Sequence, residues 1–254
     1  MPDLAVGPPP PSVHPILDGI DLVVFDKDGT LISFEAMWGG WARDLGTRLE
    51  IATRRPVAGD IFTTIGFDPV ANRVHPNGPL AIATMAAIQE LVGAILRRWC
   101  PNVGAARRIL AEVWFEPDPV ALAVPLVDLE ALLGGLRATG RRIGVATTDD
   151  RGPTEATIAA LGLDDLVDAS LCGDDDGPTK PEPAALIALA ARLGVAVEQT
   201  AMVGDTPADL RMARGAGARS VAVTNGVAPA ADLAPLADVV LNSVAELLSE
   251  DVAG

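Results

Sequence analysis

The fold is decided by the stretch LVVFDKDGTL, residues 22–31. Its first four residues are apolar and two of them are β-branched, which is typical of a buried strand. The run ends on Asp26, Asp28 follows two positions later, and Gly29-Thr30 turns the chain away. Two carboxylates therefore stand at the carboxyl end of a predicted strand, where open α/β sheets carry their chemistry.

Short apolar runs alternate with helical patterns along the second half of the chain. The predicted strands are 143–147, 169–172, 201–204, 220–224 and 239–241. The amphipathic stretches between most of them are 128–139, 154–161, 183–193 and 208–213. This alternation predicts the α/β class, a three-layer Rossmann-like parallel sheet with helices on both faces.

A long segment without strand patterns separates the first two predicted strands. Its helical signals are a stripe of Trp38, Trp41, Leu45 and Leu49, a stretch at 80–99, and a third stretch near Ile109. A parallel crossover does not need this length. We therefore predict a helical cap domain at 33–123, inserted into a core of residues 16–32 and 124–254, with a loose Pro-rich tail at 1–15.

Composition limits the partners. The chain of 254 residues carries a formal charge of −15, which argues against nucleic acid and anionic membranes as partners. Its two cysteines lack CxxC spacing, which argues against a disulfide framework or a zinc site. The apolar stretch 80–99 is long enough to imitate a membrane span, but polar residues interrupt it. With no signal-peptide pattern, we expect a cytoplasmic protein that is a monomer or a homodimer.

The DxDG string has two simpler interpretations, a calcium loop and a chance turn. A calcium loop counted from Asp26 would need glycine where Leu31 stands and glutamate where Met37 stands. Three other strand ends also carry polar residues. They are Thr147-Thr148, Lys180 in a loop, and Asp205 followed by Asp209. Singly, these residues are typical of a helix N-cap, a solvated charge and a turn, but their joint occurrence at successive strand ends favours one site.

In this order the four motifs resemble the haloacid dehalogenase-like superfamily, and the insert resembles the helical cap of its phosphoglycolate phosphatase-like branch. The resemblance implies that Asp26 is a nucleophile that forms an aspartyl-phosphate, and that Asp28 is general acid and then general base. Members named for dehalogenation lack the second Asp, so Asp28 favours phosphoryl transfer. The implied substrate is a small phosphomonoester, similar to phosphoglycolate or a sugar phosphate.

The resemblance also implies Mg²⁺, held by the side chains of Asp26 and Asp205 and the backbone carbonyl of Asp28. Asp209 would act through water or by orienting Lys180. Thr147 and Lys180, with Thr148 beside them, would hold the oxygens of the transferring phosphoryl group. Two alternatives stay open: a phosphomutase of a sugar phosphate, and a non-catalytic binding module on the same fold.

Three further residues are candidate substrate contacts. Lys27 is one of only two lysines in the chain and stands on the opposite side of the strand from Asp26 and Asp28. It either lines the entrance to the site or is exposed to solvent. Glu35 and His75 are candidates on the cap, where His75 is alternatively an exposed turn residue. The Arg54-Arg55, Arg97-Arg98 and Arg107-Arg108 pairs either meet a second anionic group or are solvated helix ends.

Overall fold

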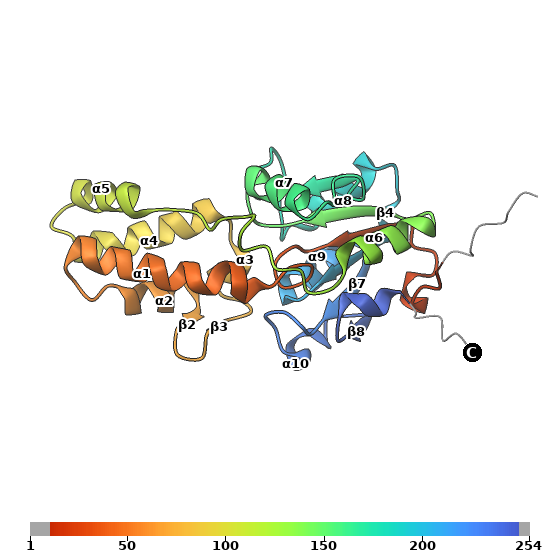
Figure 1. Ribbon diagram of the computed structural model, residues 1–254, viewed down its shortest axis with the longest axis horizontal. Helices are drawn as coiled ribbons and strands as arrows, with labels where there is room; N and C mark the ends of the chain where they lie inside the picture. The colour runs from red at the N-terminus through yellow and green to blue at the C-terminus, as the bar shows by residue number, and fades with distance from the viewer. Residues whose placement is uncertain (1–10, 249–254) are drawn as a thin grey trace, which may run out of the picture.

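A computed structural model describes residues 11–248 and shows a six-stranded parallel sheet at the centre of the core (Figure 1). The strands are β1 (Leu22–Phe25), β4 (Arg142–Ala146), β5 (Ala169–Leu171), β6 (Thr200–Gly204), β7 (Arg219–Val223) and β8 (Val239–Leu241). Their order is β5-β4-β1-β6-β7-β8. The predicted fold class is confirmed, with β1 as an inner strand whose four residues are all buried.

Helices cover both faces of this sheet. They are α6 (Leu129–Ala138), α7 (Arg151–Ala160), α8 (Pro183–Arg192), α9 (Pro207–Ala216) and α10 (Ala230–Leu233). Because side chains alternate along a strand, Val23 and Phe25 pack in the cluster that contains the leucines of α6. Leu22 and Val24 pack on the other side with residues of α8 and α9. Both faces of the sheet at β1 are therefore covered by apolar side chains.

The register of β1 places the site residues at one edge of the sheet. Phe25 is paired with Val145 of β4 and with Val203 of β6. Since all three strands run in the same direction, the residues that follow them emerge side by side. Asp26, Thr147 and Asp205 therefore lie at the same carboxyl edge, although they are far apart in the sequence.

Between β1 and β4 the chain forms a helical layer at one end of the molecule (Figure 1). It contains a π-helical turn (Glu35–Gly39), α1 (Gly40–Thr53), α2 (Ala58–Ile65), α3 (Pro79–Ile82), α4 (Met85–Trp99) and α5 (Val103–Val113). It also holds a hairpin of β2 (Phe67–Asp68) and β3 (Arg73–Val74). Neither this hairpin nor α2 was predicted. The division into domains at 33 and 123 stays a prediction.

The predicted helix at 80–99 is two helices rather than one. Ala83 is extended and ends α3, and the side chain of Thr84 then caps α4 by accepting from the Ala87 N–H. The helical prediction was correct in type but wrong in continuity, because an N-cap hydroxyl interrupts the apolar run. No helix within residues 11–248 is long and apolar enough to cross a membrane.

Most of the predicted loose tail, residues 1–15, lies outside the described residues. In its final part, Val13 forms an antiparallel bridge with Leu248, and the His14 N–H donates to the Leu247 carbonyl. His14 Nδ1 also accepts from the Ile16 N–H at the start of a short 3₁₀ turn, Pro15–Leu17. These contacts attach Val13 and His14 to Leu247 and Leu248, so the prediction of a loose tail is wrong for these two residues.

Candidate active site

The loop after β1 is closed by backbone contacts that leave little room for side chains. The Gly29 N–H donates to the Ile32 carbonyl at 2.7 Å, and Gly29 has a φ of 91°. A Cβ atom at this position would lie 2.3 Å from a carboxylate oxygen of Asp205. Glycine is therefore required for the conformation and for the close approach of the Asp205 loop.

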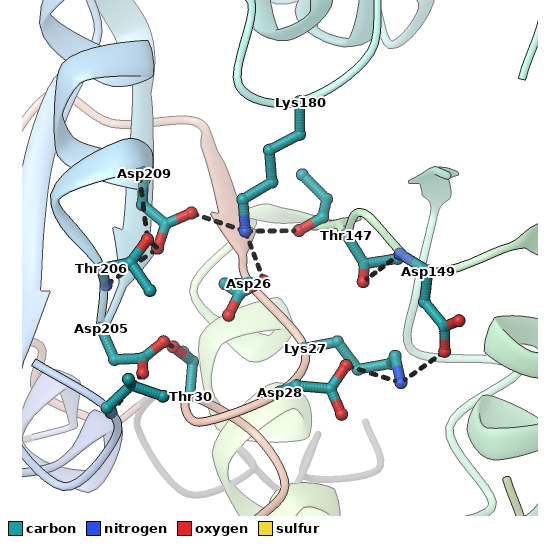
Figure 2. Close-up of polar contacts among 12 residues, drawn as sticks. Asp26, Lys27, Asp28, Thr30, Thr147, Asp149, Lys180, Asp205, Thr206 and Asp209 are labelled. Carbon is teal, nitrogen blue, oxygen red and sulfur yellow. Dashed lines mark hydrogen bonds and ion pairs between the residues drawn. The ribbon is translucent and has the colours of Figure 1, made fainter. Parts of the chain in front are cut away.

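Lys180 binds the carboxylates at the centre of the site (Figure 2). Its Nζ lies 2.5 Å from Asp26 Oδ1 and 2.6 Å from Asp209 Oδ1, and it donates to the Ala146 carbonyl at 3.5 Å. Burial opposes the charge of Lys180, but Asp209 and Asp26 outweigh it and raise the pKa of the ammonium. The ammonium of Lys180 therefore contacts the predicted nucleophile.

The carboxylates of Asp26, Asp205 and Asp209 form a buried acidic cluster. Each contributes an oxygen within 4.8 Å of the others. Burial and mutual repulsion raise the pKa of Asp26 well above its usual range and that of Asp205 to about 6. Lys180 neutralises only one of the three carboxylates. An all-oxygen donor set with excess negative charge fits a hard divalent cation, and the residues present therefore fit Mg²⁺.

Two carboxylates of the cluster, those of Asp205 and Asp209, accept hydrogen bonds from nearby backbone and hydroxyl groups. Asp205 accepts from the Thr30 hydroxyl at 3.1 Å and from the Val227 N–H at 2.6 Å. Asp209 accepts from the N–H and the hydroxyl of Thr206, at 3.0 and 2.6 Å, within the capping box that begins α9. Thr30, Thr206 and Val227 were not predicted. Only the T-x-x-D spacing of the capping box was a usable sequence signal for Thr206.

A cavity of about 20 Å³ lies beside Asp26 and is also lined by Asp28, Thr147 and Thr148. Thr147 directly follows β4, and its hydroxyl accepts from the Asp149 N–H at 3.1 Å. Residues between β1 and β4 close this cavity with an apolar wall. The residues of that wall are Phe34, Trp38, Leu80, Ala81, Ala83, Met85 and Ile88.

The structure decides against one of the two placements considered for Lys27. Only 2% of the residue is exposed, so the solvent-exposed alternative is wrong. Its Nζ lies 2.8 Å from Asp28 Oδ2 and 3.2 Å from Asp149 Oδ2 and faces these two carboxylates (Figure 2). A role for Lys27 in contacting substrate stays a prediction. The alternation of a strand does not predict this direction, because β1 ends at Phe25 and residue 27 already belongs to the loop.

Asp149 is a site residue that sequence reasoning missed. It is buried, and burial raises the pKa of its carboxyl despite the neighbouring Lys27. For Lys27 the balance is reversed, since Asp28 and Asp149 outweigh burial and raise the pKa of the ammonium. In the sequence, the only hint of a neighbouring acid such as Asp149 was the lysine that directly follows Asp26.

Glu35 and His75 do not line the cavity that contains Asp26 and Asp28. Glu35 is exposed and lines a separate cavity of about 310 Å³ together with Arg73. His75 is exposed and lines a third cavity of about 480 Å³, also with Arg73. None of the paired arginines is among the described residues that line the cavity beside Asp26. Arg97 and Arg98 lie in the last turn of α4, as expected for cations at a helix end.

A doubly covered parallel sheet, with a lysine and an acidic cluster at its carboxyl edge, defines an α/β enzyme core with a candidate metal centre. A model of haloacid dehalogenase-like hydrolases matches residues 20–217. A phosphoglycolate phosphatase of Rhodospirillum rubrum is 34% identical over 217 residues, which cover 85% of each chain. The chain therefore belongs to the haloacid dehalogenase-like hydrolase family, which confirms the resemblance seen in the sequence.

Solved structures show the same fold at lower identity. A predicted phosphoglycolate phosphatase of Haemophilus somnus matches with a TM-score of 0.63 and 20% identity, over 90% of this chain and 96% of that one. CbbY of Rhodobacter sphaeroides, solved in complex with phosphate, matches with a TM-score of 0.58 and 24% identity. That match also covers 90% of this chain and 96% of CbbY.

Proposed function

We propose that this chain is a Mg²⁺-dependent phosphatase that hydrolyses a small phosphomonoester through an aspartyl-phosphate on Asp26. The observation that carries the proposal is the position of Asp26, which contacts the Lys180 ammonium, lies within the acidic cluster and lines one cavity with Asp28. The related phosphatase of Rhodospirillum rubrum supports the reaction class. A binding module would not need this complete arrangement of nucleophile, acid and cation.

The charges of the site suit phosphoryl transfer. Asp26 and Asp205, with the backbone carbonyl of Asp28, would hold Mg²⁺, which when bound supplies positive charge to the phosphoryl oxygens. Asp209 orients Lys180 through their 2.6 Å ion pair, the second of the two roles considered from the sequence. Lys180 and the Thr147 hydroxyl bind the remaining oxygens of the transferring group.

Two proton transfers complete the reaction. An oxygen of Asp26 attacks phosphorus, the bond from phosphorus to the ester oxygen breaks, and the leaving oxygen takes a proton from Asp28. Asp28, now a carboxylate, removes a proton from a water that attacks the phosphorus of the aspartyl-phosphate. The bond between phosphorus and the Asp26 oxygen breaks and phosphate leaves. Asp26 is then a carboxylate again, and Asp28 is protonated again.

The cavity beside Asp26 limits how substrate reaches the site. Its volume of about 20 Å³ holds about one water molecule, so a phosphomonoester binds only after the cap moves. Among the described residues that line this cavity there is no arginine or lysine, so its wall offers no cation for a carboxylate on the leaving group. Substrates without a second charge therefore belong in any test beside phosphoglycolate.

The test is phosphate release from phosphoglycolate, sugar phosphates, nucleotides and p-nitrophenyl phosphate, with Mg²⁺ or with EDTA. We expect Mg²⁺-dependent release that Asp26→Asn reduces by at least about 10⁴-fold, as for other nucleophile deletions. Asp44→Asn, a matched change at an exposed position of α1, should leave the rate unchanged. Release that survives Asp26→Asn, or no release from any compound, would refute the proposal, and an isomerised sugar phosphate would identify a mutase instead.

A further inference from the structure

Lys27 forms an ion-pair cluster that stability alone does not explain. Its ammonium is taken out of water, which costs several kcal/mol before any pairing. Apolar residues of similar volume often replace such clusters without loss of stability. With methionine at position 27, no buried ammonium would need Asp149 as a partner. The cluster therefore calls for a role other than holding the core together.

The two oxygens of Asp28 have different surroundings. Oδ2 is held by Lys27 at 2.8 Å. Oδ1 is buried, and within residues 11–248 it has no hydrogen-bond partner. Asp28 also lines the small cavity with Asp26 and Thr147. Lys27 thus occupies one oxygen of the carboxyl group and leaves the other for a ligand.

Lys27 also reaches the loop that carries Thr147. Its second partner, Asp149 Oδ2, belongs to a carboxylate whose Oδ1 accepts from the Asp150 N–H at 3.0 Å. The Asp149 N–H donates to the Thr147 hydroxyl, and the Asp149 carbonyl accepts from the Gly173 N–H at 2.7 Å. A fixed Asp149 therefore fixes both Lys27 and the Thr147 hydroxyl.

We propose that Lys27 is a positioning residue, whose buried ammonium holds Asp28 in place and joins it to Asp149 on the loop that carries Thr147. The inference rests on the proposed function, in which Asp28 donates a proton to the leaving oxygen while Thr147 holds the phosphoryl group. The distance between proton donor and phosphorus is set by this bridge. Its loss therefore impairs protonation of the leaving group more than binding of phosphate.

Two aryl esters of similar size separate these effects. Phenyl phosphate has a basic leaving group that needs a proton, whereas p-nitrophenyl phosphate releases a stable anion that does not. In Lys27→Met we expect kcat/KM to fall about 10²-fold for phenyl phosphate, the scale of a misplaced catalytic group, and less than about 3-fold for p-nitrophenyl phosphate. The Asp149→Asn variant should show a smaller change in the same direction.

The controls distinguish positioning from folding. Arg137→Met breaks the 2.7 Å pair with Asp168, away from the site, and should leave the ratio of the two kcat/KM values unchanged. If Lys27→Met does not fold by circular dichroism, the double variant Lys27→Met/Asp149→Asn removes one charge of each sign and carries the same expectation. Equal losses on both esters, or no loss, would overturn the proposal. Wild-type protein inactive on both esters and on the whole panel would instead refute the phosphatase function itself.

Discussion

Replacing Asp205 by asparagine should stabilise the metal-free protein at neutral pH and remove its stabilisation by Mg²⁺. Asp205 is fully buried, and its carboxylate lies within the acidic cluster with Asp26 and Asp209. The amide of asparagine is nearly the same size, carries no charge and keeps an acceptor oxygen for the Val227 N–H. The change therefore tests the cost of charge with little change in shape.

The magnitude follows from the pKa of Asp205. Burial, followed by repulsion from Asp209, raises it from 3.8 to about 6. Roughly two pKa units correspond to about 3 kcal/mol. Because the folded state binds this proton more tightly than the unfolded state, stability falls as pH rises between these two values, and the full cost is present above the higher one.

The assay is thermal unfolding of wild type and Asp205→Asn from pH 4 to pH 8, in EDTA and in excess Mg²⁺. At pH 8 in EDTA the variant should melt about 6–12 °C above wild type, and at pH 4 the two should melt within about 2 °C of each other. Mg²⁺ at about 100 times its Kd should stabilise wild type by about 3 kcal/mol and the variant far less. The exposed Asp44→Asn change should behave as wild type throughout.

Two results would refute this reasoning. If Asp205→Asn melts at or below the wild-type temperature at pH 8 in EDTA, the buried carboxylate does not destabilise the metal-free fold. If the variant is stabilised by Mg²⁺ as strongly as wild type, Asp205 is not a metal ligand, and the fit of the cluster to Mg²⁺ needs another set of oxygens.

Three further predictions concern single residues. Lys180→Met leaves two buried carboxylates without their cation, so the free energy of unfolding should fall by about 3–5 kcal/mol. The rate of phosphate release should fall by about 10²-fold or more. Denaturation and kinetics that match wild type would contradict both expectations. Thr206→Ala removes the cap of α9 and a donor to Asp209, and should cost about 1–2 kcal/mol in urea unfolding, whereas an unchanged midpoint would argue against the capping box. Burial raises the pKa of the Cys172 thiol to about 11. A thiol reagent at pH 7 should therefore label the half-buried Cys100 alone, as mass spectrometry of the native protein would show.

The sheet and the residues at its edge were predictable because short-range patterns determine them. A buried parallel strand needs a continuous apolar run, and the polar residue that ends the run marks the carboxyl edge. Asp26, Thr147 and Asp205 each follow such a run, and the structure brings them together. The parallel register pairs Phe25 with Val145 and Val203, and it therefore aligns the ends of the three strands.

The cap was less predictable because its elements are short and depend on their neighbours. The hairpin of β2 and β3 has two residues per strand, too few for an alternating pattern to be read. The break at Ala83 depends on one threonine that competes with the helix backbone for a hydrogen bond. Glu35 and His75 lie in the same segment as Trp38, yet of these three only Trp38 lines the cavity beside Asp26, because tertiary packing decides which side chains face the core.

By itself, the sequence determined the α/β class, the family and the identity of the residues at the carboxyl edge, since strand periodicity and motif order do not depend on distant contacts. The tertiary structure alone decided what each charge faces. Lys27 and Asp149 lie on different loops, and nothing local in the sequence specifies their pairing. The fold brings these two loops together, and because an unpaired buried ammonium is costly, Lys27 pairs with the carboxylates it meets there.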